Sequence, residues 1–210
     1  MSINVSKIKT ILKTLRERYP VVKTQLVHES PFQLLIATIM SAQCTDNQVN
    51  KVSKKLFKKF PDPKTLGNAP LKDIKKIIYS TGFYNNKAKN IKACAQTVLN
   101  EYDSIVPNSI DHLVKLPGVG RKTANVVLSA AFGQQTIVVD THVLRISRRL
   151  GLTKKTNPEK VEYKLMDIIP KTSWNDLSLQ LIYFGREICD AKKPLCQDCP
   201  LFEICPTRGK

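Results

Sequence analysis

Hydrophobic residues recur along this chain at intervals of three and four, which is the spacing of an α-helix with one buried face. Ser6 is the expected N-cap of the first such helix, whose apolar face consists of Ile8, Ile11, Leu12 and Leu15. Ser30 followed by Pro31 predicts the start of a second helix over Phe32–Ala42, because Pro is favoured at the first helical position.

Gly, Pro and Asn residues separate the later helical segments from one another. Asp46 is the expected N-cap of one segment, which ends at Pro61–Asp62–Pro63. The others are Leu71–Ser80, Asn86–Asn100, Ser109–Leu116, Arg121–Phe132, Thr141–Leu150, Pro158–Ile168 and Trp174–Cys189. The single strand-like run, Thr136–Val139, is short. Long helices with short connections predict an all-α protein.

The composition is that of a folded protein with a strong positive charge. With 210 residues, 42% of them hydrophobic and 24% charged, the chain can form one large domain or two small ones. It has no run of about 18 apolar residues of the kind that crosses a bilayer. Lys and Arg outnumber Asp and Glu by 34 to 17. Such an excess favours phosphate-rich partners, although a basic surface that only serves solubility gives the same count.

Four of the six cysteines lie close together near the C-terminus, at Cys189, Cys196, Cys199 and Cys205. Four thiols at this spacing, among several prolines, indicate a metal site, either tetrahedral zinc or an iron–sulfur cluster, rather than disulfides. Lys192 and Lys193 lie in the first loop of this segment, where a metal would fix two cations against a phosphate backbone. Cys44 and Cys94 are predicted to be small buried residues.

The segment Leu116–Ala124 (LPGVGRKTA) predicts two helices joined by a turn that contains Gly118 and Gly120. The two glycines permit positive φ and let the backbone come close to a ligand without obstruction by a Cβ. N–H groups at the start of the second helix, together with the helix dipole, attract a phosphate. The segment is therefore interpreted as a helix-hairpin-helix that grips a DNA backbone, rather than as a plain helical hairpin. Arg121 and Lys122 directly after the turn favour this interpretation.

Lys122 and Asp140 are the candidate catalytic pair. A lysine amine beside another cation loses part of its preference for the charged form, so that it can attack a sugar carbon and form a Schiff base. Asp140 follows the apolar run Val138–Val139, where an acid is often an N-cap. A carboxylate that faces Lys122 across a groove could also accept its proton or stabilise positive charge on a sugar. His142 has no identifiable partner and is expected to be structural.

Taken together, these segments resemble the endonuclease III family, the bifunctional DNA glycosylases and abasic-site lyases of base excision repair. The resemblance runs from about Val5 to Cys205. The segments that match the family are Ser30–Ala37 (SPFQLLIA), Ser41–Asp46 (SAQCTD), the hairpin, Val139–His142 (VDTH) and the four-cysteine loop.

The resemblance implies two α-helical lobes that flank a DNA-binding groove. Residues 24–134 would form a six-helix barrel that contains the hairpin at about 109–132. Residues 1–23 would join 135–210 in a lobe that carries one 4Fe–4S cluster, with its loop at 189–205. The partner would be double-stranded DNA with damaged pyrimidines or abasic sites, bound by a monomer.

The resemblance also assigns roles to residues. Lys122 matches the nucleophile and Asp140 the essential carboxylate, and the four clustered cysteines match the cluster ligands. Gln43 matches the glutamine that fills the gap left by the flipped nucleotide. Phe83 stands at a second wedge where the family often has leucine, and a Phe can also enter a base step.

Two other functions fit parts of the sequence. An adenine glycosylase relative shares the barrel and cluster, but it typically lacks the hairpin lysine and has a further C-terminal domain. The second is a non-catalytic DNA-binding module with a zinc knot.

The basic segment Met1–Arg16 faintly resembles a transit peptide, but its apolar spacing favours an ordinary helix. The expected location is the cytoplasm of a bacterial-type cell, in association with DNA.

Overall fold

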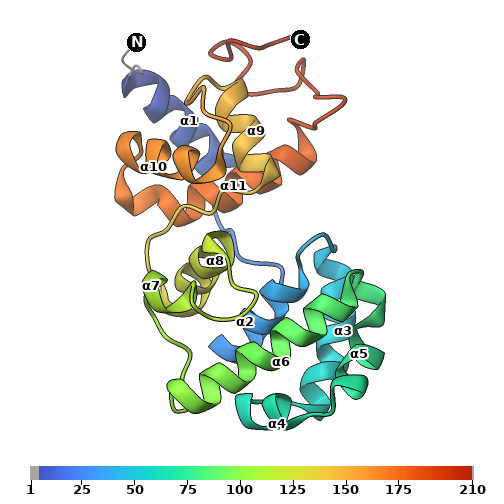
Figure 1. The fold of residues 1–210 in the computed structure, drawn as a ribbon. Helices are drawn as coiled ribbons and strands as arrows, with labels where there is room; N and C mark the ends of the chain where they lie inside the picture. Colours follow the sequence, from blue (N-terminus) through green and yellow to red (C-terminus); the bar gives the residue numbers. More distant parts are fainter. Residues whose placement is uncertain (1–4, 210) are drawn as a thin grey trace. The chain divides into compact units, whose positions relative to one another are not determined.

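The computed structural model describes residues 5–209, which consist of α-helices, short 3₁₀ turns and connecting loops (Figure 1). These residues contain no β-strand, so the predicted all-α class is confirmed. They divide into two compact units. One is the continuous segment Thr24–Gln134, and the other joins the N-terminal segment up to Lys23 with the C-terminal segment from Gln135. Each unit has its own hydrophobic core.

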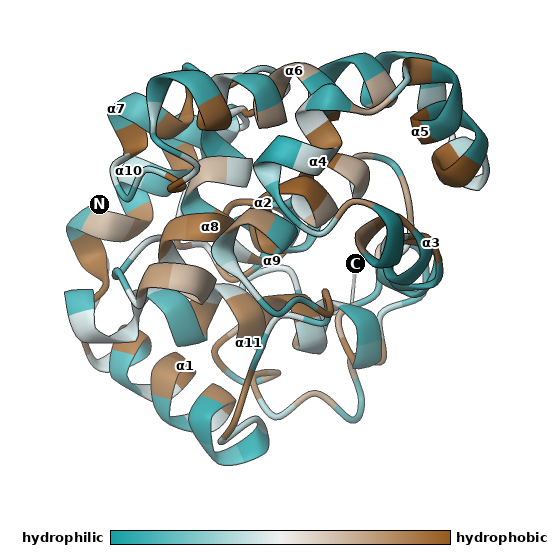
Figure 2. Ribbon diagram, turned by 90° about the horizontal axis from the view of Figure 1, so that it is seen from below, coloured by the Kyte–Doolittle hydropathy of each residue, from teal (hydrophilic) through white to brown (hydrophobic). Residues whose placement is uncertain are grey.

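The unit Thr24–Gln134 is built around α2 (Pro31–Met40), in which every residue from Phe32 to Met40 is buried. Helix α2 packs against α3, α6 and α8. The other helices of this unit are α3 (Asp46–Lys59), α4 (Pro63–Asn68), α5 (Leu71–Ile78), η1 (Tyr79–Thr81), α6 (Tyr84–Glu101), α7 (Ile110–Leu113) and α8 (Arg121–Phe132). Hydrophilic and hydrophobic residues alternate around the surrounding helices, as along α6 in Figure 2, because only one face of each is buried.

The second unit is organised around α11 (Trp174–Glu187), which packs against α1 (Val5–Arg18) and α9 (Thr141–Arg149). It also contains α10 (Pro158–Ile168) and η2 (Lys171–Ser173). At the junction of α1 and α11, Arg18 and the Tyr19 hydroxyl both donate hydrogen bonds to the Glu187 carboxylate. These contacts join segments that are far apart in the sequence.

Several helix ends differ from the sequence-based predictions. Helix α1 begins at Val5, so Ser6 lies inside the helix instead of capping it. The cap of α3 is Thr45, whose hydroxyl accepts the Gln48 N–H, and Asp46 is the first residue of the helix. Thr45 has the extended backbone that an N-cap residue requires.

Helix α4 was not predicted, because Pro61–Asp62–Pro63 was interpreted only as the end of the preceding helix. Asp62 also starts a new helix, since it forms a capping box with Thr65 and Pro63 follows at the first helical position. Helix α6 begins at Tyr84, two residues earlier than expected. Helix α7 is a single turn, Ile110–Leu113, rather than the predicted Ser109–Leu116.

The strand-like run Thr136–Val139 forms no strand. Its N–H groups bond to side chains of α11 instead: Thr136 donates to Asn175 Oδ1 (2.8 Å) and Val138 to Ser178 Oγ (3.0 Å). The apolar side chains of this run are buried. It therefore leads the chain along α11 to Asp140, the N-cap of α9.

Candidate functional site

The turn between α7 and α8 is shaped by Gly118. Its φ of +77° lies in the left-handed region that favours glycine. A Cβ at this position would lie 2.8 Å from Asn90 Cβ on α6, so a side chain is excluded by packing as well. The Val119 N–H donates to the Leu116 carbonyl (3.1 Å), and the buried Val119 side chain fixes the turn to the core.

Of the two properties expected of the hairpin glycines, positive φ and unobstructed approach to a ligand, Gly120 lacks the first. Its φ is −91°, which any residue can adopt, so positive φ is not the reason for glycine here. A Cβ at Gly120 would meet nothing within 4 Å. Gly120 is the N-cap residue of α8, and no side chain caps this helix in the described structure. The start of α8 is therefore an open backbone surface with a positive helix dipole.

Lys122 is the second residue of α8, and its side chain is exposed, whereas Arg121 is half-buried. The buried face of α8 consists of Ala124, Asn125, Val127 and Leu128, and α8 packs on α2. The core thus holds the helix, and the amine of Lys122 stays accessible at its N-terminus.

Gln43 and Phe83 lie in two exposed turns of the same unit as Lys122. Both have left-handed backbone, with φ of 53° and 47°, which is uncommon for residues other than glycine. Gln48 on α3 donates to the Ser80 hydroxyl on η1 (2.6 Å) and so links the helix that follows Gln43 to the turn that precedes Phe83. Strained, exposed residues of this kind are typical of functional sites.

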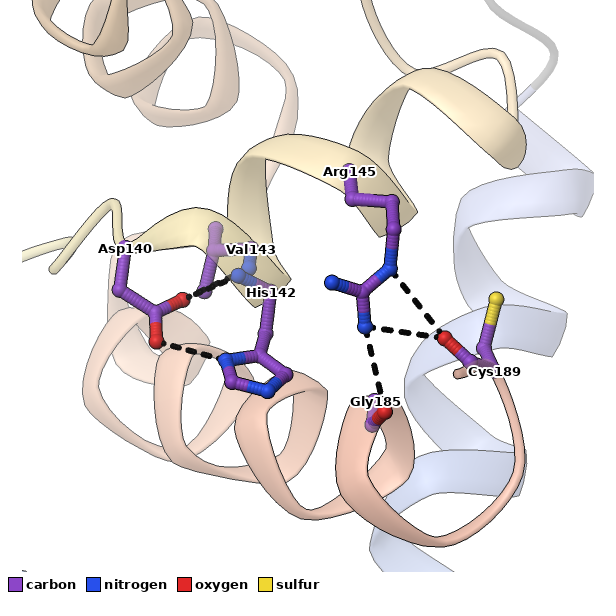
Figure 3. A network of polar contacts seen from close by, with 6 residues as sticks. All are labelled: Asp140, His142, Val143, Arg145, Gly185 and Cys189. Atoms are coloured by element: carbon purple, nitrogen blue, oxygen red, sulfur yellow. Dashed lines mark hydrogen bonds and ion pairs between the residues drawn. The ribbon is translucent and has the colours of Figure 1, made fainter. Parts of the chain in front are cut away.

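Asp140 caps α9, as the sequence predicts. One carboxylate oxygen, Oδ1, accepts the N–H groups of His142 and Val143, each at 2.8 Å, and the other, Oδ2, lies 3.0 Å from His142 Nδ1 (Figure 3). The Asp140 side chain is only 13% exposed. Three hydrogen bonds therefore fix the position and orientation of this carboxylate.

His142 was expected to have no partner, and this expectation is wrong. Its ring contacts Asp140 Oδ2 and lies against α11 at Gly185, where an added Cβ would be 2.8 Å from His142 Cδ2. Gly185 therefore allows α9 and α11 to approach closely. The spacing of two residues between Asp140 and His142 at a helix N-terminus is the sequence signal that could have revealed the pair.

Cys189, Cys196, Cys199 and Cys205 all line one pocket in the unit that contains α9 and α11. Its other walls include the apolar side chains of Phe184, Ile188 and Leu195. Burial raises the pKa of Cys199, and the charges of the other three thiols raise it further. Four sulfur donors around one apolar pocket are a donor set that suits a metal group. Among residues 5–209, no three His, Cys, Asp or Glu side chains are arranged to hold a single metal ion.

Two arginines of α9 hold the segment that begins at Cys189. Arg145 donates to the carbonyls of Cys189 and Gly185 (Figure 3), and Arg149 donates to Cys189 Sγ (3.4 Å) and to the carbonyls of Asp190 and Ala191. Sequence reasoning missed both arginines, because only packing brings α9 to this segment. Helix α9 thus positions the Asp140 carboxylate at its start and the first cysteine at its end.

Lys192 and Lys193 are exposed, and their backbone is fixed by Asp190. The Asp190 carboxylate accepts the N–H groups of Lys192 (2.8 Å) and Lys193 (3.0 Å). These hydrogen bonds lower the pKa of Asp190, and the one from Lys193 has the larger effect.

Of the two other cysteines, Cys94 is buried as predicted, and burial raises its pKa to about 12. Cys44 is only half-buried.

Comparison with known proteins places the chain in a family. Residues 36–171 match the model of the "HhH-GPD superfamily base excision DNA repair protein". Endonuclease III of Synechocystis sp. is 47% identical over 99% of this chain and 95% of its own length. The solved structures of a non-covalent endonuclease III–DNA complex and of a trapped endonuclease III–DNA covalent intermediate match with TM-scores of 0.93 and 0.94. Both are 44% identical, and both matches cover 98% of this chain and 97% of the other.

The chain therefore belongs to the HhH-GPD superfamily of base excision DNA repair proteins, and within it to the endonuclease III family. The resemblance inferred from the sequence motifs is confirmed. None of the helices in residues 5–209 has the length and hydrophobicity to cross a membrane.

Proposed function

We propose that this protein excises oxidised pyrimidines from duplex DNA and then cleaves the strand at the resulting abasic site. The observation that carries the proposal is Lys122, an exposed amine on the second residue of α8, directly after the glycine turn. Membership of the endonuclease III family and the likeness to a covalently trapped enzyme–DNA structure support it. An enzyme that is trapped covalently on DNA needs a nucleophile, and Lys122 supplies one.

Phosphate contacts would hold the DNA. The open start of α8 next to Gly118 and Gly120 can receive one backbone phosphate, with Arg121 beside it. Lys192 and Lys193, on the loop fixed by Asp190, would contact the backbone as well. These contacts carry no sequence information, which suits an enzyme that must act at any position in a genome.

Gln43 and Phe83 would stabilise the distorted duplex. An enzyme that acts on a base has to take it out of the stack, and this costs least for a damaged base. An apolar side chain can enter the unstacked step, and an amide can occupy the space left by the base. Phe83, 67% exposed, and Gln43 offer these two groups from turns of one rigid unit.

The chemistry would proceed through Lys122. After losing a proton, its Nζ forms a bond to C1′ while the bond from C1′ to the base breaks and the base leaves with the bonding electrons. The ring then opens to an imine, which makes the C2′ proton acidic. Removal of that proton breaks the C3′–O bond and cuts the strand on the 3′ side by β-elimination. Asp140, whose side chain is oriented by three hydrogen bonds, would stabilise positive charge and accept a proton in these steps.

Cys189, Cys196, Cys199 and Cys205 would hold one 4Fe–4S cluster, and residues 135–210 with the N-terminal segment would form the cluster domain. The residues 24–134 would form the six-helix barrel domain. When bound, the cluster cross-links the loop through four Fe–S bonds and so fixes Lys192 and Lys193. Metal analysis should find four irons and four sulfides per chain. Zinc without sulfide would contradict this assignment.

A cleavage assay with borohydride trapping tests the activity. Wild-type protein should nick duplexes that contain thymine glycol or an abasic site, and borohydride should link it covalently to the DNA. Lys122→Gln and Lys122→Arg should both abolish trapping, and Lys122→Arg should retain DNA binding because it keeps the charge. Trapping that survives both substitutions would contradict the role of Lys122. Removal of adenine opposite 8-oxoguanine, without trapping, would identify an adenine glycosylase, and binding without nicking would identify a non-catalytic module.

We further propose that the enzyme acts as a monomer in the cytoplasm. One chain supplies all residues of the proposed site, so no second copy is needed. Sedimentation of the protein on a short damaged duplex should give one chain per DNA.

A further inference from the structure

Lys87 on α6 is a buried cation that the proposed chemistry does not use. Lys87 is only 5% exposed, and its Nζ donates a hydrogen bond to the Thr81 carbonyl (2.7 Å). Its backbone N–H donates to the Phe83 carbonyl (3.1 Å). Through these two hydrogen bonds, one residue holds the chain on both sides of Gly82–Phe83.

The burial of Lys87 indicates a specific role. Lysine is almost never fully buried in proteins unless it is paired, because removing an ammonium from water is costly. Burial lowers the pKa of Lys87, while Cys44 nearby acts in the opposite direction. Cys44 directly follows Gln43, so the amine that bonds the turn of Phe83 also interacts electrostatically with the turn of Gln43.

The segment that Lys87 holds is strained. Gly82 has φ 68° and ψ 154°, and Phe83 has φ 47° and ψ 26°, a left-handed conformation unusual for a bulky residue. Phe83 has no side-chain cap bond, and its ring is 67% exposed. Such conformations persist only where the surroundings fix them. Before Gly82, two hydrogen bonds hold η1. The Thr81 hydroxyl donates to the Ile78 carbonyl, and the Gln48 amide donates to the Ser80 hydroxyl. After Gly82, the Phe83 carbonyl accepts the backbone N–H groups of Asn86 (3.2 Å) and Lys87 (3.1 Å). The amine of Lys87 reaches back across the turn to the Thr81 carbonyl.

We propose that Lys87 is a positioning residue for damage recognition, which holds Phe83 in its exposed, left-handed conformation ready to enter the base step. This inference rests on the proposed glycosylase function, in which Phe83 is the wedge. The Lys87 side chain acts through its hydrogen bond to the Thr81 carbonyl, directly before Gly82–Phe83, and not through contact with the DNA or the reacting atoms. Its loss therefore reduces the fraction of enzyme with a preformed wedge.

Lys87→Met tests the proposal, because methionine has a similar length and no donor. Its control is Lys92→Met on the same helix, which removes an equivalent hydrogen bond from Nζ to the Ala69 carbonyl (2.8 Å), remote from Phe83 in sequence. Lys87→Met should lower the single-turnover rate of thymine glycol excision by about tenfold, as expected when one charge-assisted hydrogen bond is lost. Lys92→Met should change thermal stability only, and Lys87→Arg, which keeps a donor, should restore part of the rate.

A double-mutant cycle with Phe83→Ala separates positioning from general destabilisation. If Lys87 acts through Phe83, Lys87→Met should have no effect on the excision rate in the Phe83→Ala background. The fluorescence of a 2-aminopurine placed opposite the lesion should fall in both single variants, and furthest in Phe83→Ala, because Lys87→Met lowers the fraction of ordered wedge while Phe83→Ala removes the wedge. Multiplicative effects of the two substitutions, or an equal loss of rate in Lys92→Met, would overturn the proposal.

The wild-type protein distinguishes this inference from the proposed function. Without excision or trapping by the wild type, the proposed function itself is wrong. Normal wild-type activity together with an unchanged excision rate in Lys87→Met refutes the positioning role alone.

Discussion

Asp140 and His142 form a closed pair at the start of α9, in which each oxygen of the carboxylate contacts a different nitrogen of the histidine. Oδ1 accepts the backbone N–H at 2.8 Å, and Oδ2 lies 3.0 Å from Nδ1. Because the Asp140 side chain is 13% exposed, water competes little for these bonds. The same group thus caps a helix and presents a fixed negative charge.

These two roles of Asp140 can be separated by substitution. Asparagine keeps the Oδ1 acceptor and removes the charge, so Asp140→Asn should lower the free energy of unfolding by less than about 1 kcal/mol. Alanine also removes the cap, and Asp140→Ala should lower it by about 1–2 kcal/mol. Excision by Asp140→Asn should fall by about 10²-fold or more if the charge assists the chemistry. Chemical denaturation measures the effect on stability, and single-turnover assays measure the effect on excision. A fully active Asp140→Asn would show that Asp140 serves only as a helix cap.

The two hairpin glycines should respond differently to alanine. Gly118→Ala should destabilise the protein by about 1–3 kcal/mol, because φ is +77° and the new Cβ would clash with Asn90. Gly120→Ala meets no atom within 4 Å and has φ −91°, so stability should change little. Its methyl group would instead obstruct an approaching phosphate and weaken DNA binding. Thermal melts and binding to an abasic duplex measure the contrast, and equal melting temperatures of the two variants would contradict it.

Gly185 should tolerate no side chain. An added Cβ would lie 2.8 Å from His142 Cδ2, 2.9 Å from Ile146 Cδ1 and 3.0 Å from Arg145 Nη2, so α9 would have to move away from α11. Gly185→Ala should therefore cost about 1–3 kcal/mol of stability. It should also lower activity and metal content, because α9 carries both Asp140 and the arginines that hold the cysteine loop. Ala130→Ser, at an exposed position of α8, is a control that should leave all three unchanged.

Tyr19 should make the free energy of unfolding depend on pH in alkaline solution. Burial, followed by its hydrogen bond to Glu187, raises the pKa of Tyr19 from 10.0 to about 12. The neutral phenol is favoured in the fold, so its stabilising contribution is complete below pH 10 and is lost as the pH rises toward 12. The difference in unfolding free energy between wild type and Tyr19→Phe should shrink over this range. A constant difference in denaturation series at several pH values would contradict the shift.

The helical class and the family both follow from the amino-acid sequence alone. Apolar spacing marked α8 and α10 at their observed ends, and Ser30 and Asp140 were identified as caps, because these signals depend on neighbours within one or two turns. The family followed from several short motifs in order. The roles of Lys122 and of the four cysteines stay predictions that rest on those motifs.

The residues that support the candidate site could be identified only from the packing of the helices. Arg145 and Arg149 lie 40 to 44 positions before the carbonyls that they bond, and no local pattern connects them. The local sequence around Lys87 is that of an ordinary surface lysine on a basic helix, and only the packing of the fold buries its amine. Local signals specify where helices begin and end, but contacts between distant segments depend on how the helices pack, and that is decided by the whole core.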